Sequence, residues 1–338
     1  MRKILKQASL RFTKKFITNN TYKPKLRHVI TGLQQHSQGT LPNIAIFNSP
    51  RGGSTWLAET LTSARGLACI NEPFLPRYDS RQPEHRDFPF ECFLSRPRPR
   101  LIPSTISEET LLNQYLNDYE GLKKYRQSNP FASNFTLRST RLLFKLNHVG
   151  LIFDHWLKGN QANLQKLFMF RHPAATVLSQ HKAFGNDPLD QISTPRELSF
   201  LQLTQKEKKH VLTARESHDP FLRLATVWAL EHLGIRNALR GKKHDFILTS
   251  YEQLVAEPNE FARICGLLQI EYSRKIRVAA GIPSNSTSAE RLNSVSPEER
   301  LMDWKTKLEP RDLDSIKRTL ETFEISFYNM KEPWIATE

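Results

Sequence analysis

Residues 43–61 read NIAIFNSPRGGSTWLAETL, and they are the most informative part of the sequence. Its first part, Asn43–Asn48, is a short apolar run with β-branched residues, which is typical of a buried strand in a parallel sheet. The next five residues break the run, and a helix that Ser54 or Thr55 can cap is expected to follow. The sequence therefore predicts a strand, a glycine-rich turn and a helix N-terminus in succession.

Such a turn is suited to bind a phosphate, because it gathers backbone N–H groups and the positive end of a helix dipole at one point. Gly52 and Gly53 let the backbone approach a ligand closely. Arg51 adds a fixed positive charge with several hydrogen-bond donors. The turn is not a Walker A loop, which places a lysine directly after its glycines. An ordinary capped turn between a strand and a helix is the alternative reading.

The turn resembles the 5′-phosphosulfate loop of sulfotransferases that use 3′-phosphoadenosine-5′-phosphosulfate (PAPS). That family typically shows Pro, Arg or Lys, Ser or Gly, Gly, Ser or Thr, and Thr after its first strand, often followed by Trp. Residues 50–56, PRGGSTW, match this pattern position by position. The resemblance implies that the donor is bound by Arg51, Gly52, Gly53, Ser54, Thr55 and Trp56. Trp56 is expected to stack on adenine, unless it is a core aromatic residue of an apolar helix face.

A second stretch, RHPAATVLS, begins at Arg171, directly after the predicted strand 166–170. Pro173 suits the first turn of a helix, which would carry Ser179. Sulfotransferases have an Arg-Asp-Pro or Arg-His-Pro turn with a Ser eight residues after its Arg, and the two residues bind the 3′-phosphate of the nucleotide. The resemblance therefore implies this role for Arg171 and Ser179.

Three residues are candidates for catalysis. A sugar hydroxyl is a weak acid, so its attack on sulfur needs a general base. Glu72 follows the predicted strand 67–70, and carbohydrate sulfotransferases carry a catalytic Glu there, often before Pro; a surface Glu in a turn is the alternative. His148 is the rival base, although it lies one residue further from Lys145 than the His of cytosolic members, and a structural histidine is the other reading. Lys145 is expected to contact the transferring group or the leaving oxygen.

The resemblance continues to the C-terminus. Tyr251 begins a Tyr-Glu-Gln-Leu stretch like the family's Tyr-Glu-Asp-Leu, whose Tyr lies near adenine; a core or capping aromatic residue is an equal alternative. Arg291 begins an Arg-Leu-Asn-Ser stretch that resembles an Arg-Asp-Ser pattern of bacterial members, and we expect it to bind the nucleotide. No metal is expected, because a sulfuryl group carries less charge than a γ-phosphate and no carboxylate set suggests a metal site.

Composition indicates an anionic partner and a reducing compartment. The chain of 338 residues has a formal net charge of +15, and ten Lys or Arg residues precede its first acidic residue, Glu59. Residues 1–20 have basic and apolar positions at helical spacing, so they predict either peripheral membrane contact, a helix packed on the domain, or a disordered arm. The three cysteines are far apart, and neither a signal peptide nor a membrane span is visible. We therefore expect a cytoplasmic protein, and peripheral contact at the inner membrane surface is one of the three readings of residues 1–20.

A long segment, residues 73–103, holds seven prolines and six arginines without periodicity. Loops of this length are usually functional, and its arginines suit an anionic acceptor; a solvated surface loop is an equal alternative. Residues 108–126 then show the apolar periodicity of a helix, and residues 221–239 are expected to form one further long helix. Residues 141–146 and 245–248 predict two more strands.

These observations predict an α/β protein with a three-layer P-loop-like fold, in which helices flank a central parallel sheet. A basic segment, residues 1–40, precedes a single sulfotransferase domain, residues 41–338. The predicted activity is transfer of a sulfuryl group from PAPS, with 3′-phosphoadenosine-5′-phosphate (PAP) as product, to a hydroxyl of a carbohydrate, polysaccharide or glycolipid. The alternatives are a P-loop-type nucleotide kinase and a non-enzymatic anion-binding protein. Specific nucleic-acid binding is not expected, because no motif for it is present.

Overall fold

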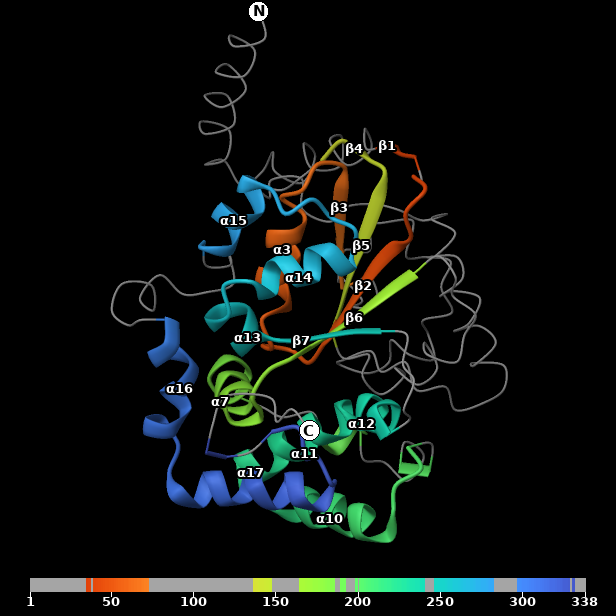
Figure 1. Ribbon diagram of the computed structural model, residues 1–338. Helices are drawn as coiled ribbons and strands as arrows, with labels where there is room; N and C mark the ends of the chain where they lie inside the picture. Colours follow the sequence, from red (N-terminus) through yellow and green to blue (C-terminus); the bar gives the residue numbers. More distant parts are fainter. Residues whose placement is uncertain are drawn as a thin grey trace, which may run out of the picture.

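The computed structural model describes the framework on which the predicted site stands (Figure 1). The described residues are 35–37, 39–72, 136–147, 164–185, 189–192, 198–199, 201–240, 246–282, 297–328 and 330–331. Several predictions lie outside these residues: those for the basic segment before residue 35, the loop 73–103, the helix 108–126, His148 and Arg291.

Among the described residues, five parallel strands form a central sheet. Its order is β3 (Leu67–Asn71), β5 (Arg141–Asn147), β2 (Asn43–Asn48), β6 (Leu164–Phe170) and β7 (Phe246–Ser250). Every residue of β2 is buried, because this strand is central and both sheet faces are covered. The short strands β1 (Gln35–His36) and β4 (Arg138–Ser139) form a separate parallel pair.

Helices cover both faces of the sheet. Alternate residues of β2 point to opposite faces: Ile44 and Ile46 join one core cluster, and Ala45 and Phe47 join the other. The first cluster includes residues of α3 (Ser54–Leu61), α13 (Tyr251–Ala256), α14 (Glu260–Leu267) and α15 (Arg274–Ala280). The second includes residues of α7 (Pro173–Phe184), α8 (Leu189–Ile192), α10 (Gln205–Glu216), α11 (Pro220–Glu231), α12 (Leu233–Arg240), α16 (Pro297–Lys307) and α17 (Pro310–Thr322). Figure 1 shows the two groups on opposite sides of the sheet.

The fold class predicted from the sequence is confirmed: a central parallel sheet lies between two helical layers. The predicted strands all form, and Pro173 stands at the first position of α7. Within the described ranges, no helix is long and apolar enough to span a membrane.

One helix prediction is wrong. The apolar pattern over residues 221–239 predicts a single helix, but the chain forms α11 and α12 with His232 between them. His232 has φ −102° and ψ 3°, and its Nδ1 donates to the carbonyl of Trp228 at 2.7 Å. When a side-chain donor shares a carbonyl with the backbone hydrogen bonds of a helix, the helix is weakened at that turn.

Candidate active site

The predicted site residues stand at the carboxyl ends of adjacent parallel strands. β2 is flanked by β5 on one side and β6 on the other, and the chain leaves β2 toward α3. Ligands of open α/β sheets bind at the edge where the strand order reverses in this way. The residues that follow β2, β3, β5 and β6 therefore meet at one place.

The glycine loop, residues 49–53, closes the end of β2 tightly. Arg51 has φ 67° and Gly53 has φ 97°, so the backbone passes through the left-handed region at both residues. A Cβ on Gly52 would meet the side-chain oxygen of Asn48 at 1.8 Å, and one on Gly53 would meet the Tyr251 ring at 2.6 Å. Both glycines are thus required by close contacts.

The helix that follows the glycine loop is not capped as predicted. Gly53 is the N-cap of α3, and no side chain among the described residues caps this helix. Ser54 is the first helical residue, and its hydroxyl donates to Oδ1 of Asn147 on β5 at 3.0 Å. The prediction that Ser54 or Thr55 caps α3 is therefore wrong, because Ser54 lies inside the helix and makes its bond across the sheet edge.

The two stretches that resemble nucleotide loops come together. Nη1 of Arg171 donates to the carbonyl of Arg51 at 2.7 Å, and Nε of Arg51 donates to the hydroxyl of Ser179 at 3.2 Å. Gln180 anchors the same loop, because its Nε2 donates to the carbonyl of Pro50 at 2.9 Å. Two guanidinium groups, a hydroxyl and the glycine loop thus form one strongly basic corner.

Two buried polar groups in this corner have no hydrogen-bond partner among the described residues. Both amide atoms of Asn48 are unpaired, and so is Nε of Arg171. Unpaired buried polar groups are costly and need an explanation, such as a ligand that completes their bonding. The site therefore has donor capacity available for an anion.

Aromatic side chains form one wall of the corner. The guanidinium of Arg171 lies over the ring of Tyr251, with Cζ 4.6 Å from its centroid. Trp56 meets Tyr251 edge to face at 5.5 Å, and its indole N–H donates to the carbonyl of Ala280 at 3.1 Å. Tyr251 and Trp56 thus lie directly beside the glycine loop.

A cluster of polar side chains around the Glu72 carboxylate lies on the other side of the glycine loop. It consists of Glu72, Lys145, Asn147 and Asn71. Oε1 of Glu72 accepts from Nζ of Lys145 at 2.5 Å and from Nδ2 of Asn147 at 2.7 Å. Lys145 also donates to Oδ1 of Asn71 at 3.0 Å. Glu72 has φ 48°, a strained backbone conformation for a residue with a side chain, and such strain is common at functional sites.

A fully buried polar layer adjoins Arg171 at the next residue of the chain, His172. Glu252 accepts from the backbone N–H of His172 at 3.0 Å and from the hydroxyl of Tyr328 at 3.1 Å. Burial raises the pKa of Glu252 to about 7, although the His172 N–H and the charge of Arg171 act in the opposite direction. Burial also raises the pKa of Tyr328 well above its usual value, and the charge of Glu252 adds to this. The layer joins α7, α13 and the C-terminal segment.

The structure brings together all predicted site residues that it describes, in two adjoining groups. Arg51, Arg171 and Ser179 interact directly, and Lys145 holds Glu72. Thr55 is the second residue of α3 and lies beside the same loop. Sequence reasoning missed Asn48, Asn147 and Gln180; the two asparagines end buried parallel strands, and that position is the signal that could have found them.

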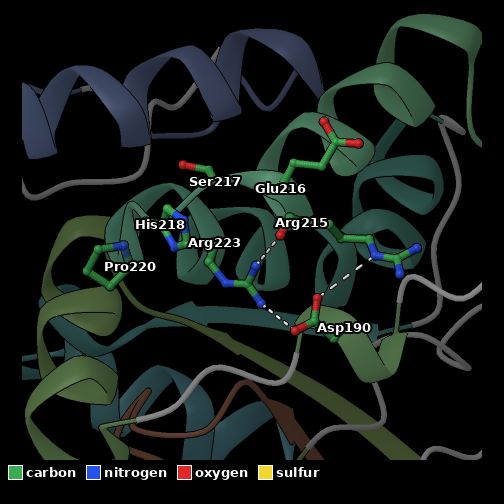
Figure 2. A pocket seen from close by; sticks show the side chains of 7 residues that line it. All are labelled: Asp190, Arg215, Glu216, Ser217, His218, Pro220 and Arg223. Atoms are coloured by element: carbon green, nitrogen blue, oxygen red, sulfur yellow. Dashed lines mark hydrogen bonds and ion pairs between the residues drawn. The ribbon is translucent and has the colours of Figure 1, made fainter.

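A separate surface hollow shares no residue with this site. It encloses about 320 Å³ and is lined by Asp190, Arg215, Glu216, Ser217, His218, Pro220 and Arg223. Figure 2 shows Arg215 and Arg223 turned toward Asp190. Nε of Arg215 lies 3.9 Å from Oδ1 of Asp190, and Nη2 of Arg223 lies 2.8 Å from its Oδ2. Asp190 is 65% exposed, so these ion pairs are weak and the charges of the hollow largely satisfy one another.

Comparison with known proteins gives distant structural similarity. No protein-family model and no curated protein matches the chain. A sulfotransferase domain from the Synechococcus PCC 7002 olefin synthase is 16% identical with a TM-score of 0.46, over 88% of this chain and all of that one. A sulfotransferase domain from the curacin biosynthetic pathway is 17% identical with a TM-score of 0.45, over 85% and 99%. Mouse sulfotransferase SULT7A1 complexed with PAP is 14% identical with a TM-score of 0.43, over 86% of each chain. Similarity this distant does not identify a family.

Proposed function

We propose that this protein is a PAPS-dependent sulfotransferase that moves a sulfuryl group to a hydroxyl of a carbohydrate, polysaccharide or glycolipid. One observation carries the proposal. The two stretches that resemble the phosphosulfate loop and the 3′-phosphate loop stand 120 residues apart in the chain, yet Arg171 donates to the carbonyl of Arg51. Arg51 in turn reaches Ser179, the second residue of the other motif. An ordinary capped turn between a strand and a helix does not account for this junction.

The chemistry of the corner suits a nucleotide with several anionic groups. Within the part of the chain that the structure describes, Asn48 and Arg171 have unpaired donors there and no side chain caps α3. We infer that Arg51, Gly52, Gly53, Ser54 and Thr55 hold the 5′-phosphosulfate of the donor, and that Arg171 and Ser179 hold its 3′-phosphate. Trp56 and Tyr251 line the adenine position, and Arg291 is assigned to the nucleotide from its motif alone.

PAPS supplies an activated sulfuryl group when it is bound. The residues of this chain then position the acceptor and manage its proton. We assign the role of general base to Glu72, which is fixed by two donors on one carboxylate oxygen. Lys145 places a positive charge beside the reacting groups. His148 remains the rival base. Among the described residues, no group of three His, Cys, Asp or Glu is placed to hold a metal ion, and the proposed transfer uses none.

The proposed acceptor and membrane contact follow from the positive charge of the sequence. The basic sequence suits an acidic or lipid-linked saccharide acceptor, and residues 1–20 are assigned to peripheral contact with the inner membrane surface of a cytoplasmic protein. No specific nucleic acid is assigned as a partner.

Two ligand mixtures separate this proposal from its alternatives. The melting temperature is measured with PAP in EDTA and with ATP and Mg²⁺. Under the proposal, PAP in EDTA raises the melting temperature and ATP with Mg²⁺ gives the smaller rise. A rise with ATP and Mg²⁺ alone favours the nucleotide kinase. No rise with either, together with salt-sensitive binding to any polyanion, favours a non-enzymatic anion-binding protein.

A further inference from the structure

We propose that Asn147 is a positioning residue that couples the glycine loop to the carboxylate of Glu72. The inference rests on the proposed function and adds to it a residue that the sequence motifs did not assign. Asn147 ends β5 and is paired in register with Asn48, the last residue of β2. Its side chain therefore stands between the two parts of the site.

The two ends of the Asn147 amide make different bonds. Oδ1 accepts from the hydroxyl of Ser54 at 3.0 Å, and Nδ2 donates to Oε1 of Glu72 at 2.7 Å. An ionised carboxylate can only accept, so the NH₂ group of Asn147 must face Glu72. A side-chain amide is one of the few groups that can accept a hydrogen bond on one side and donate one on the other. In this site, the amide of Asn147 connects Ser54 to Glu72 in this way.

The bonds to Glu72 leave its second oxygen available. Lys145 and Asn147 both donate to Oε1, and no described residue donates to Oε2. Two donors on one oxygen fix the plane of the carboxylate and leave the other oxygen for a further partner. We therefore assign Oε2 as the atom that takes the acceptor's proton while the acceptor oxygen bonds to sulfur. The bond from sulfur to the bridging oxygen breaks, and PAP leaves with that electron pair.

Ser54 makes the connection responsive to the donor. It is the first residue of α3, at the point where the glycine loop ends. A shift of Ser54 on donor binding is passed to Glu72 through two hydrogen bonds. The backbone of Glu72 is held at φ 48° by a bond from its N–H to the carbonyl of Lys145 at 2.8 Å, so its position depends on such ties.

The test compares Asn147→Ala and Asn147→Asp with the matched control Asn43→Ala. Asn43 is a buried asparagine at the opposite end of β2, and its Oδ1 accepts from the Leu142 N–H of β5 at 2.9 Å. Formation of PAP from PAPS is followed in EDTA across pH, with octyl glucoside as a hydroxyl-bearing probe and with water alone. Binding of PAP is measured beside it.

We expect Asn147→Ala to lower kcat about 10- to 100-fold, since a misplaced base costs this much, with the KM for PAPS changed less than about threefold. In Asn147→Asp, two facing carboxylates retain a proton to higher pH, so the acid limb of the pH profile moves up by about one pH unit. Asn43→Ala lowers the melting temperature but keeps kcat within about threefold of wild type.

The outcomes separate the inference from the proposed function. Wild-type protein that forms no PAP with either acceptor overturns the proposed transfer, and the inference with it. If the wild-type protein is active, two results for Asn147→Ala overturn the inference alone. The variant either keeps half of the wild-type rate or loses no more rate than Asn43→Ala does. If Asn147→Ala does not fold, Asn147→Asp decides, because it keeps the size of the side chain and the acceptor for Ser54; an unmoved acid limb then contradicts the coupling.

Discussion

Single residues at the candidate site are held in backbone conformations that are unfavourable elsewhere. Arg51 and Glu72, on neighbouring loops, both have positive φ values. Such a residue is strained by roughly 1–3 kcal/mol and is retained where the surroundings enforce it. The strain turns the side chain of Glu72 back toward Lys145 and the guanidinium of Arg51 toward Ser179.

Gly53→Ala tests the close contact of the glycine loop. Its φ is 97°, and a Cβ would meet the Tyr251 ring at 2.6 Å. We expect a loss of about 2 kcal/mol or more in unfolding free energy and about a tenfold loss in PAP affinity. Gly185→Ala is the matched control, because it also has a positive φ but nothing within 4 Å of a Cβ. The control should lose about 1 kcal/mol and keep its PAP affinity, and equal effects on PAP affinity would contradict the role of the contact.

Glu72→Gln tests the assignment of the base. Glutamine can still accept from Lys145 and Asn147, but it cannot take a proton. We expect the formation of PAP from PAPS to slow about 10²- to 10⁴-fold while the PAP affinity stays within about threefold of wild type. His148→Ala is measured in parallel. A large loss of kcat in His148→Ala, with Glu72→Gln near wild type, assigns the base to His148 instead.

At the scale of elements, α7 supports both motifs. It begins two residues after Arg171 and carries Ser179 and Gln180 on its buried side. A helix fixes the spacing of these side chains, so the glycine loop is bound to a rigid element.

Gln180→Ala tests this support. The substitution leaves the buried carbonyl of Pro50 without its donor, which costs about 1–3 kcal/mol. We expect a lower melting temperature together with about a tenfold loss of PAP affinity, because the glycine loop loses its tie to α7. Thr204→Ala, which removes the N-cap of α10, should lose a similar stability of about 1 kcal/mol and no PAP affinity. Equal PAP affinities in the two variants would show that α7 does not organise the loop.

The sequence predicted the elements well where one signal dominated. β2 has uninterrupted apolar character, and a strand buried on both faces requires this. The break at His232 was not predictable, because it depends on a bond between the His232 ring and a backbone carbonyl that apolar periodicity does not encode. The same limit applies to the site. The residue types of Arg51 and Arg171 indicate anion binding, whereas the bridge through Asn147 exists only because β2, β3 and β5 end together.

On the scale of the whole molecule, two fully buried titratable side chains, Glu252 and His232, change the free energy of unfolding with pH in opposite directions. Burial raises the pKa of Glu252 to about 7 from 4.5, so the folded state holds a proton that the unfolded chain has lost. The contribution of Glu252 to the free energy of unfolding, ~3 kcal/mol, is therefore lost as pH rises from about 4.5 to 7. Burial lowers the pKa of His232 to about 4 from 6.5, so its contribution is lost as pH falls through that range. The two effects largely cancel between about pH 4.5 and 6.5.

Glu252→Gln and His232→Phe expose the two opposed contributions. The free energy of unfolding is measured in urea at several pH values, and the difference from wild type is plotted against pH. Relative to wild type, Glu252→Gln should become less stable on acidification from about pH 7 to 5, because it lacks the stability that wild type gains when Glu252 takes up a proton. His232→Phe should show the opposite slope. If the difference in unfolding free energy from wild type does not change with pH in either variant, the pKa shifts assigned to Glu252 and His232 are contradicted.

The measurement that decides the function is a calorimetric titration of the purified protein with PAP in EDTA, beside Arg51→Ala, Arg171→Ala and Arg138→Ala. Arg138 is an exposed arginine of β4 outside the site, so it controls for loss of charge. We expect metal-independent binding that falls about 10- to 100-fold in each of the two site variants and stays unchanged in Arg138→Ala. A folded wild-type protein that does not bind PAP would contradict the sulfotransferase assignment.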